Sequence, residues 1–150
     1  MSASETTAGR PVVAVIGTGG TFAMEGRHPF DWVEYGDSGI VRPLTAVLAD
    51  LGPLPVGVEV APVSFRAVGS TAIGWSDWRD LLKAVDAVIA EHRDLAGVVV
   101  TYGTATLEET AWFLDLTLDV APTVVVVGAQ RPPNTAGSDA AGNLRAALAV

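Results

Sequence analysis

The chain has 150 residues, of which 49% are hydrophobic and 17% are charged, a balance that fits one domain with a buried core and excludes a disordered polymer. Its formal net charge of −8 at pH 7 argues against nucleic acid or an anionic membrane surface as a partner. Because the chain contains no cysteine, a disulfide framework, a thiolate nucleophile and a cysteine-based metal site are excluded as well.

The N-terminal segment is small and polar, and we expect residues 1–11 to form a disordered tail before a single α/β domain at 12–150. This segment lacks the apolar core of a signal peptide, and no later run is long enough to span a bilayer. A cytoplasmic location is therefore expected.

An apolar run at residues 12–16 predicts the first strand, and the glycine-rich turn GTGGT at 17–21 follows it. This turn is not a dinucleotide-binding fingerprint, because Phe22 stands where the third glycine would be, and no P-loop lysine follows. The turn ends at Thr21, which places a hydroxyl behind the glycines at the end of a buried strand.

Residues 22–40 show no clear period and contain several glycines and a proline, which predicts a long loop. Phe30, Trp32 and Tyr35 lie in this loop, an aromatic content that is unusual for a linker. We interpret the segment as a lid. An aromatic-anchored Ω-loop without a role in chemistry is the alternative.

The rest of the chain alternates between apolar runs and amphipathic segments. The pattern predicts, in order, a helix at 43–51, a strand at 57–63, a loop at 64–73, a helix capped by Ser76 and ending near His92, a strand at 97–101, a helix at 107–119, a strand at 123–127, a loop at 128–137 and a helix that starts at Ser138 and Asp139. Continuous apolar strands that alternate with helices are typical of an open, mainly parallel sheet with helices on both faces, the doubly wound α/β class.

The segment TYGTATLEET at residues 101–110 predicts a second turn between a buried strand and a helix. Thr106 with Glu109 three residues later predicts a capping box at the start of that helix. Thr104 then lies at the carboxyl end of its strand, where open α/β sheets bind ligands. Because Thr21 occupies the equivalent point of the first strand, we expect the two hydroxyls to line one crevice between adjacent strands.

Three motifs in this order and spacing, TGGT at 18–21, GTATLEET at 103–110 and GAQRP at 128–132, resemble those of the asparaginase/glutaminase family of amidohydrolases. The resemblance runs from about residue 12 to the end of the chain and covers what looks like the family's larger, N-terminal α/β domain. It implies a hydrolase that acts on carbon–nitrogen bonds other than peptide bonds. It also implies a threonine nucleophile, a small-molecule substrate with an asparagine-like side-chain amide or a related acyl bond, and neither cofactor nor metal.

The resemblance further implies roles for particular residues. Thr21 attacks the substrate carbonyl, Tyr35 assists it, and Thr104 belongs to a second catalytic group with a lysine as proton acceptor. Ser70 holds the substrate's carboxylate, and the backbone N–H groups of Thr21 and Ala129 form the oxyanion hole. The complete implied substrate-binding set is Gly20, Ser70, Thr71, Gly103, Ala105 and Ala129.

The sequence departs from the family's pattern at three of these positions or beside them. Ala105 stands where aspartate is usual, Thr71 where glutamine is usual, and Tyr102 where histidine is usual. The first two family residues help to hold the α-amino group of asparagine, so we expect a substrate without a free α-amino group. Hydrolysis of a lactam or ester at the same site and a non-catalytic, ligand-binding relative are the two alternatives.

The single lysine, Lys83, lies in mid-helix and is expected on the surface, whereas the family's catalytic lysine would fall beyond residue 150. No capping glycine follows the last helix, whose Leu144 and Leu148 would need cover. We therefore expect a domain that is incomplete at its C-terminus and inactive alone. A homo-oligomer, or a second chain that carries the C-terminal half, would complete it.

Overall fold

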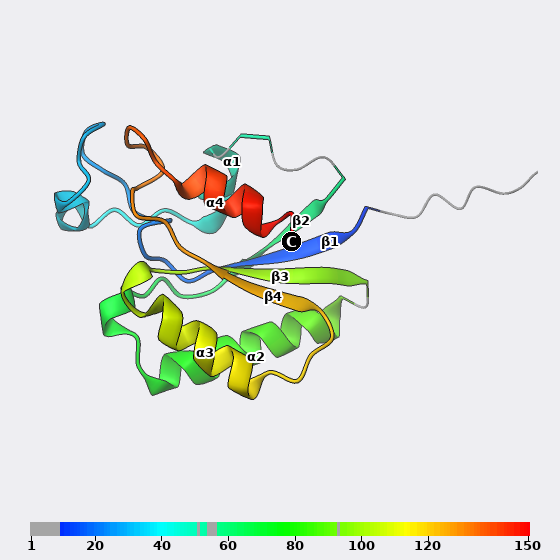
Figure 1. Ribbon diagram of the computed structural model, residues 1–150. Helices are drawn as coiled ribbons and strands as arrows, with labels where there is room; N and C mark the ends of the chain where they lie inside the picture. Colours follow the sequence, from blue (N-terminus) through cyan, green and yellow to red (C-terminus); the bar gives the residue numbers. More distant parts are fainter. Residues whose placement is uncertain (1–9, 51, 54–56, 93) are drawn as a thin grey trace, which may run out of the picture.

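The computed structural model describes residues 10–50, 52–53, 57–92 and 94–150 (Figure 1). Residues 1–9 of the predicted tail lie outside the described residues. The tail prediction is wrong for Pro11, whose carbonyl oxygen accepts a hydrogen bond from the Glu59 N–H at 3.0 Å. Backbone pairing along the sheet therefore begins before Val12.

Four parallel strands form one sheet in the order β2-β1-β3-β4. Their bounds are β1 Val12–Gly17, β2 Glu59–Ser64, β3 Leu95–Thr101 and β4 Thr123–Val127. Because the strands are parallel, their carboxyl ends all lie at one edge of the sheet, on the left in Figure 1.

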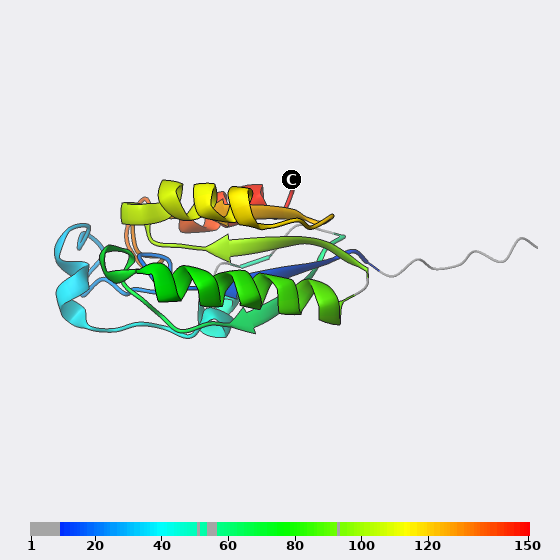
Figure 2. The same cartoon turned by 90° about the horizontal axis from the view of Figure 1, so that it is seen from below.

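Helices cover both faces of this sheet. α1 Leu44–Asp50 and α4 Ala140–Ala147 lie on one face, and α2 Trp75–Glu91 and α3 Leu107–Thr117 lie on the other (Figures 1 and 2). Three short 3-10 turns, η1 Glu34–Ser38, η2 Ser70–Ala72 and η3 Thr104–Thr106, lie in the connecting loops. The predicted open, parallel α/β sheet with helices on both faces is confirmed. Among the described residues, no helix combines the length and the apolar character that crossing a membrane requires.

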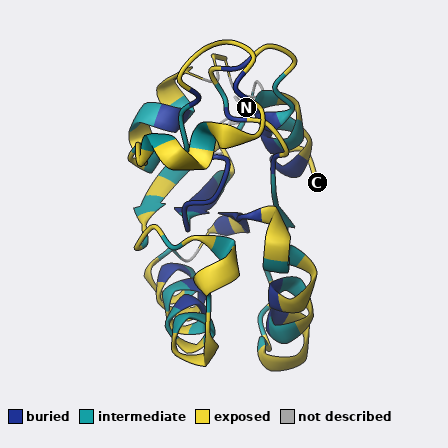
Figure 3. Ribbon diagram, turned by 90° about the vertical axis from the view of Figure 1, so that its left-hand side faces the viewer, coloured by how far each residue is buried: buried dark blue, intermediate teal, exposed yellow. Residues whose placement is uncertain are grey.

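The core consists of two layers, because successive strand residues point to opposite faces. Val15 and Val99 pack with Leu144 in the layer under α1 and α4. Ile16 and Val100 pack with helix residues in the layer over α2 and α3. Figure 3 shows buried strand segments in the middle of the molecule and the exposed outer surfaces of the helices around them.

The start of α2 differs from its prediction. Gly74 is the N-cap residue, not Ser76. The Asp77 carboxylate accepts the Gly74 N–H at 2.9 Å. An acidic side chain of the first turn thus caps the start of the helix, and no hydroxyl is needed at the N-cap position.

The predicted capping box of α3 is also wrong. Thr106 does occupy the N-cap position, but its side chain makes no hydrogen bond to the helix. Its hydroxyl donates instead to the Ser70 carbonyl oxygen at 2.9 Å, so a contact with another loop replaces the local bond to the helix that carries Glu109.

The last helix ends at Ala147, with Leu148, not a glycine, as its C-cap residue. The predicted exposure of Leu144 and Leu148 is wrong, because they are 1% and 5% exposed. Both belong to the same buried layer as Val15. The sheet itself therefore covers the leucine pair.

Candidate active site

Three loops converge at the carboxyl edge of the sheet. Gly20, after β1, has a φ of 65°, and a Cβ atom at this position would lie 2.4 Å from the Cα of Gly103, after β3. A Cβ atom on Gly103 would in turn lie 2.5 Å from the Oγ of Ser70. Because only glycine permits backbones to approach this closely, these two positions bring the predicted site residues of three loops together.

The first turn holds Thr21 in a buried position against the lid. Thr21 is 6% exposed, and its Oγ1 lies 2.9 Å from the phenol oxygen of Tyr35 in η1. Either hydroxyl can donate in this hydrogen bond. The geometry gives the threonine a neighbouring oxygen that can accept or relay its proton.

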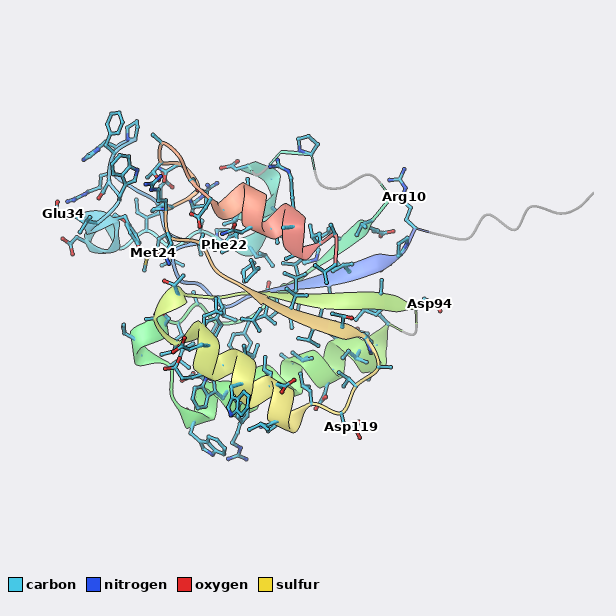
Figure 4. All side chains as sticks on the ribbon, viewed as in Figure 1. Arg10, Phe22, Met24, Glu34, Asp94 and Asp119 are labelled. Atoms are coloured by element: carbon cyan, nitrogen blue, oxygen red, sulfur yellow. The ribbon has the colours of Figure 1, made fainter. Side chains whose placement is uncertain are left out.

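The lid at residues 22–40 leaves the sheet edge and returns to it. In Figure 4 the labelled Phe22 and Met24 mark where the chain leaves, and Glu34 marks the far part of the loop. Met24 forms an isolated antiparallel bridge with Val41, which closes the base of the loop.

Asp31 fixes the interior of the lid. Its side chain is 2% exposed, and its carboxylate accepts the Arg27 N–H and Nε–H, both at 3.0 Å, and the Glu34 N–H at 3.1 Å. The bond from the Arg27 backbone N–H holds the pKa of Asp31 below its ordinary value, burial opposes this, and the Arg27 guanidinium adds to the lowering. Asp31 is therefore an ionised anchor at neutral pH.

The lid is fastened to the loop at 128–137. The Gly26 N–H donates to Asn134 Oδ1 at 2.9 Å, and Asn134 Nδ2 donates to the Gly26 carbonyl at 2.7 Å. Trp32 Nε1 donates to the Ala136 carbonyl at 3.0 Å, and the guanidinium carbon of Arg131 lies 4.9 Å from the Trp32 ring centroid. The loop that carries Tyr35 is thus joined directly to the loop that carries Ala129.

Ser70 and Thr71 lie in η2, beside the second turn. The Ser70 Oγ accepts the Ala105 N–H at 3.4 Å, and the Ser70 carbonyl accepts the Thr106 hydroxyl at 2.9 Å. Thr71 and Ala105 are exposed. Three members of the predicted substrate-binding set therefore belong to one surface region.

The second turn presents Thr104 on the surface. A Cβ atom on Gly128 would lie 2.9 Å from the Cγ2 of Thr104, so the loop after β4 contacts this turn directly. Ala129, the next residue, is 1% exposed. Within the part of the chain that the structure describes, the N–H groups of Thr21 and Ala129 donate to no protein acceptor.

Sequence reasoning missed two residues of this region, Asp139 and Asn143. The Asp139 carboxylate accepts the N–H groups of Gln130 and Arg131 at 3.0 Å. Asn143 Nδ2 donates to Asp139 at 2.9 Å and to the Gly128 carbonyl at 3.0 Å. The available signal was an aspartate and an asparagine four residues apart, on one helix face, soon after the GAQRP motif.

Burial raises the pKa of Asp139, but the hydrogen bonds from the Gln130 and Arg131 backbone N–H groups outweigh it, and the pKa lies below its ordinary value. Asp139 is therefore a carboxylate, and so only a hydrogen-bond acceptor, at neutral pH.

Lys83 has a side chain that is 68% exposed and lies 3.4 Å from Asp80, which confirms its predicted surface position. No cluster of histidine, aspartate and glutamate among the described residues could hold a metal ion. A cavity of about 360 Å³ adjoins the first turn at Gly17 and Gly19, on the side of α1.

Residues 12–150 match the family model "Asparaginase, N-terminal". The chain is 37% identical to probable L-asparaginase 4 of Schizosaccharomyces pombe over 142 residues, and the aligned region covers 93% of this chain and 38% of that protein. It is 36% identical over 143 residues to L-asparaginase 2 of Bacillus subtilis, covering 93% of this chain and 36% of that protein. The chain thus spans well under half the length of these curated relatives.

Solved structures show the same arrangement. The probable cytoplasmic L-asparaginase from Campylobacter jejuni superimposes with a TM-score of 0.76 at 29% identity, over 93% of this chain and 39% of that one. The thermostable L-asparaginase from Thermococcus kodakarensis gives a TM-score of 0.74 at 27% identity, over 91% of this chain and 39% of that one.

Proposed function

Because the chain belongs to the asparaginase family through its N-terminal domain, we propose that it carries the nucleophile of an asparaginase-like amidohydrolase. The observation that carries the proposal is the 2.9 Å hydrogen bond between Thr21 Oγ1 and the Tyr35 phenol at the carboxyl edge of the sheet. In this proposal Thr21 attacks the amide carbon of a small-molecule substrate. Residues 12–150 are the N-terminal α/β catalytic domain of the enzyme.

A threonine hydroxyl is a weak nucleophile until a neighbouring group takes its proton, and Tyr35 is placed to do so or to relay it. The attack converts the carbonyl oxygen to an oxyanion, which the N–H groups of Thr21 and Ala129 stabilise. The carbon–nitrogen bond then breaks, and the leaving nitrogen takes up a proton and departs as ammonia. Water hydrolyses the remaining acyl-threonine ester.

Thr104 forms the second catalytic group, with a lysine as its proton acceptor. Lys83 is the only lysine of the chain, and it lies exposed on α2. The lysine that serves Thr104 therefore comes from outside these 150 residues. A segment with the C-terminal half of the enzyme supplies it, because a neighbouring copy of these same residues would add only another Lys83.

The preferred substrate lacks a free α-amino group. Ala105 offers no side-chain acceptor, and Thr71 offers a hydroxyl where the family usually has an amide. A substrate ammonium that is desolvated at this position would have no charged hydrogen-bond partner. Its binding free energy would lack the contribution of about 1.5–3 kcal/mol that such a hydrogen bond makes. This corresponds to roughly tenfold to hundredfold in selectivity.

The test is steady-state kinetics of the complete protein with L-asparagine, its des-amino analogue, and matched ester and lactam substrates. Thr21→Ala should lower kcat by roughly 10⁴-fold or more, because it removes the nucleophile. Thr117→Ala is the matched control, since its hydroxyl donates only within α3, to the Phe113 carbonyl. Equal turnover in wild type and Thr21→Ala would refute the nucleophile assignment.

The same assay tests the substrate. Ala105→Asp should move the preference toward L-asparagine by roughly tenfold to hundredfold. A clear preference of the unmodified protein for L-asparagine would contradict this part of the proposal. Binding of a substrate without any turnover would favour the non-catalytic alternative.

A further inference from the structure

Resting on the proposed function, we propose that Asp139 and Asn143 are positioning residues that hold Ala129 so that its backbone N–H faces the reacting carbonyl. They act through the loop at 128–131 and do not touch the substrate. Together their side chains bind the backbone on both sides of Ala129, at Gly128, Gln130 and Arg131.

The side chain of Asp139 serves the loop and not its own helix. Aspartate at an N-cap ordinarily accepts an N–H from the first turn of the helix that it begins. Asp139 is the N-cap residue of α4, yet its side chain makes no such bond. Both of its oxygens lie 3.0 Å from the Gln130 nitrogen, and one lies 3.0 Å from the Arg131 nitrogen.

Asn143 fixes the peptide unit that contains the proposed oxyanion donor. The Gly128 carbonyl and the Ala129 N–H belong to the same planar peptide, and in a trans peptide they point in opposite directions. Asn143 Nδ2 binds that carbonyl at 3.0 Å from α4. The Ala129 N–H is therefore directed away from α4.

The loop at 128–131 lies next to the second turn, so the direction of the Ala129 N–H affects the candidate site. A Cβ atom on Gly128 would lie 2.9 Å from side-chain atoms of both Thr104 and Leu107, so there is no space for a side chain at this position. The loop therefore lies against the second turn. The Ala129 N–H donates to no acceptor among the described residues. Donors that stabilise an oxyanion must be held in place before the reaction. A loosely held N–H would have to reorient as the charge develops, and the free energy of that reorientation would reduce the stabilisation of the transition state.

Asp139 and Asn143 also hold each other in place. Asn143 Nδ2 donates to Asp139 Oδ2 at 2.9 Å and so holds the carboxylate toward the loop. The Asp139 carboxylate accepts hydrogen bonds from N–H groups only. The amide of an asparagine at this position would point its own N–H donors at some of those N–H groups. Asp139→Asn therefore disrupts the grip on the loop while keeping the size of the side chain.

The experiment compares the complete wild-type protein with Asp139→Asn, Asn143→Ala and the control Asp86→Asn, which changes an exposed aspartate of α2. Each is measured for kcat, KM and the inhibition constant of a tetrahedral boronate or phosphonate analogue of the substrate. Asp139→Asn and Asn143→Ala should each lower kcat about tenfold to hundredfold, with KM changed less than about twofold. The affinity for the tetrahedral analogue should fall by the same factor as kcat.

A merely structural role gives a different pattern, in which the thermal midpoint falls while kcat and analogue affinity per folded molecule stay at wild-type values. That outcome overturns the assignment, as does a parallel rise in KM. If Asn143→Ala does not fold, the size-matched Asp139→Asn carries the test alone. A wild-type protein without Thr21-dependent turnover overturns the proposed function together with this assignment. Thr21-dependent turnover that is insensitive to both changes overturns this assignment only.

Discussion

The two threonine turns occupy equivalent places on neighbouring strands, yet their surroundings are opposite. Thr21 is buried, and its hydroxyl is bound to Tyr35. Thr104 is exposed, and no group in the described part of the chain forms a hydrogen bond with its hydroxyl. This chain thus supplies the surroundings of the first threonine by itself, while the second threonine is open to a group from elsewhere.

The difference follows from what comes after each turn. The residues after Thr21 form a long lid that folds back and returns Tyr35 to the turn. After Thr104 only the short η3 intervenes before α3 begins at Leu107, so no loop is available to cover the hydroxyl. The length of the following loop, more than the threonine itself, determines how each turn is supported.

Gly20→Ala is expected to have the largest effect, because it forces the two turns apart. The residue has a φ of 65°, and its Cβ atom would lie 2.4 Å from the Gly103 Cα. Backbone strain and overpacking together should destabilise the protein by about 3–5 kcal/mol and abolish activity. Urea unfolding measures this. Gly142→Ala in α4, where a Cβ atom meets nothing within 4 Å, should instead stabilise by about 0.5–1 kcal/mol.

Tyr35→Phe tests whether the buried turn depends on its phenol. It removes the oxygen 2.9 Å from Thr21 Oγ1 and should lower kcat by about 10²–10³-fold with little change in KM. Tyr102→Phe is the matched change near the exposed turn, where the phenol lies 3.5 Å from Thr106 Oγ1, and should lower kcat less than about threefold. Equal losses in the two variants would remove the contrast between the turns.

Thr106→Val tests the support of the exposed turn. It deletes the hydroxyl that donates to the Ser70 carbonyl at 2.9 Å, so we expect a loss of about 1 kcal/mol in stability and a KM raised about twofold to fivefold. Thr117→Val removes a hydroxyl bond within one helix and should change neither value appreciably. Unchanged KM in Thr106→Val would show that Ser70 holds its place without the second turn.

Acid should loosen the lid, and only at low pH. The folded pKa of Asp31 is depressed below its ordinary 3.8, so its stabilising effect is full above that pH and is lost as the pH falls through the folded value. Trp32 fluorescence, taken as the difference between wild type and Trp32→Phe, should change below pH 3.8 and stay constant above it. Asp31→Asn should abolish this transition, and a transition centred above pH 5 would contradict the assignment to Asp31.

The strands could be read from the sequence because each is largely an apolar run, which is buried along most of β1 and β3. The predicted bounds of the strand at 123–127 agree with β4, and the strands at 12–16 and 97–101 lie within β1 and β3. The glycine-threonine turns were found for the same reason, since a turn must follow where an apolar run ends.

The features that depend on distant partners could not be read in this way. The Thr106 hydroxyl binds the Ser70 carbonyl, 36 residues away in the chain, and this contact displaced the expected cap. Leu148 is covered by a core layer contributed largely by earlier segments. The role of Asn143 appears only when the Gly128 carbonyl, 15 residues earlier, is seen beside it.

The central position of β1 has a consequence for the order of folding. Thr18 binds the Thr101 carbonyl 83 residues later, and Gly26 binds Asn134 108 residues later. During synthesis, the turn with Thr21 is therefore made well before Thr101 and Asn134, whose contacts support it. At about 5–20 residues per second, the interval between Gly26 and Asn134 amounts to roughly 5–20 s. The surroundings of Thr21 are thus incomplete on the nascent chain throughout that interval.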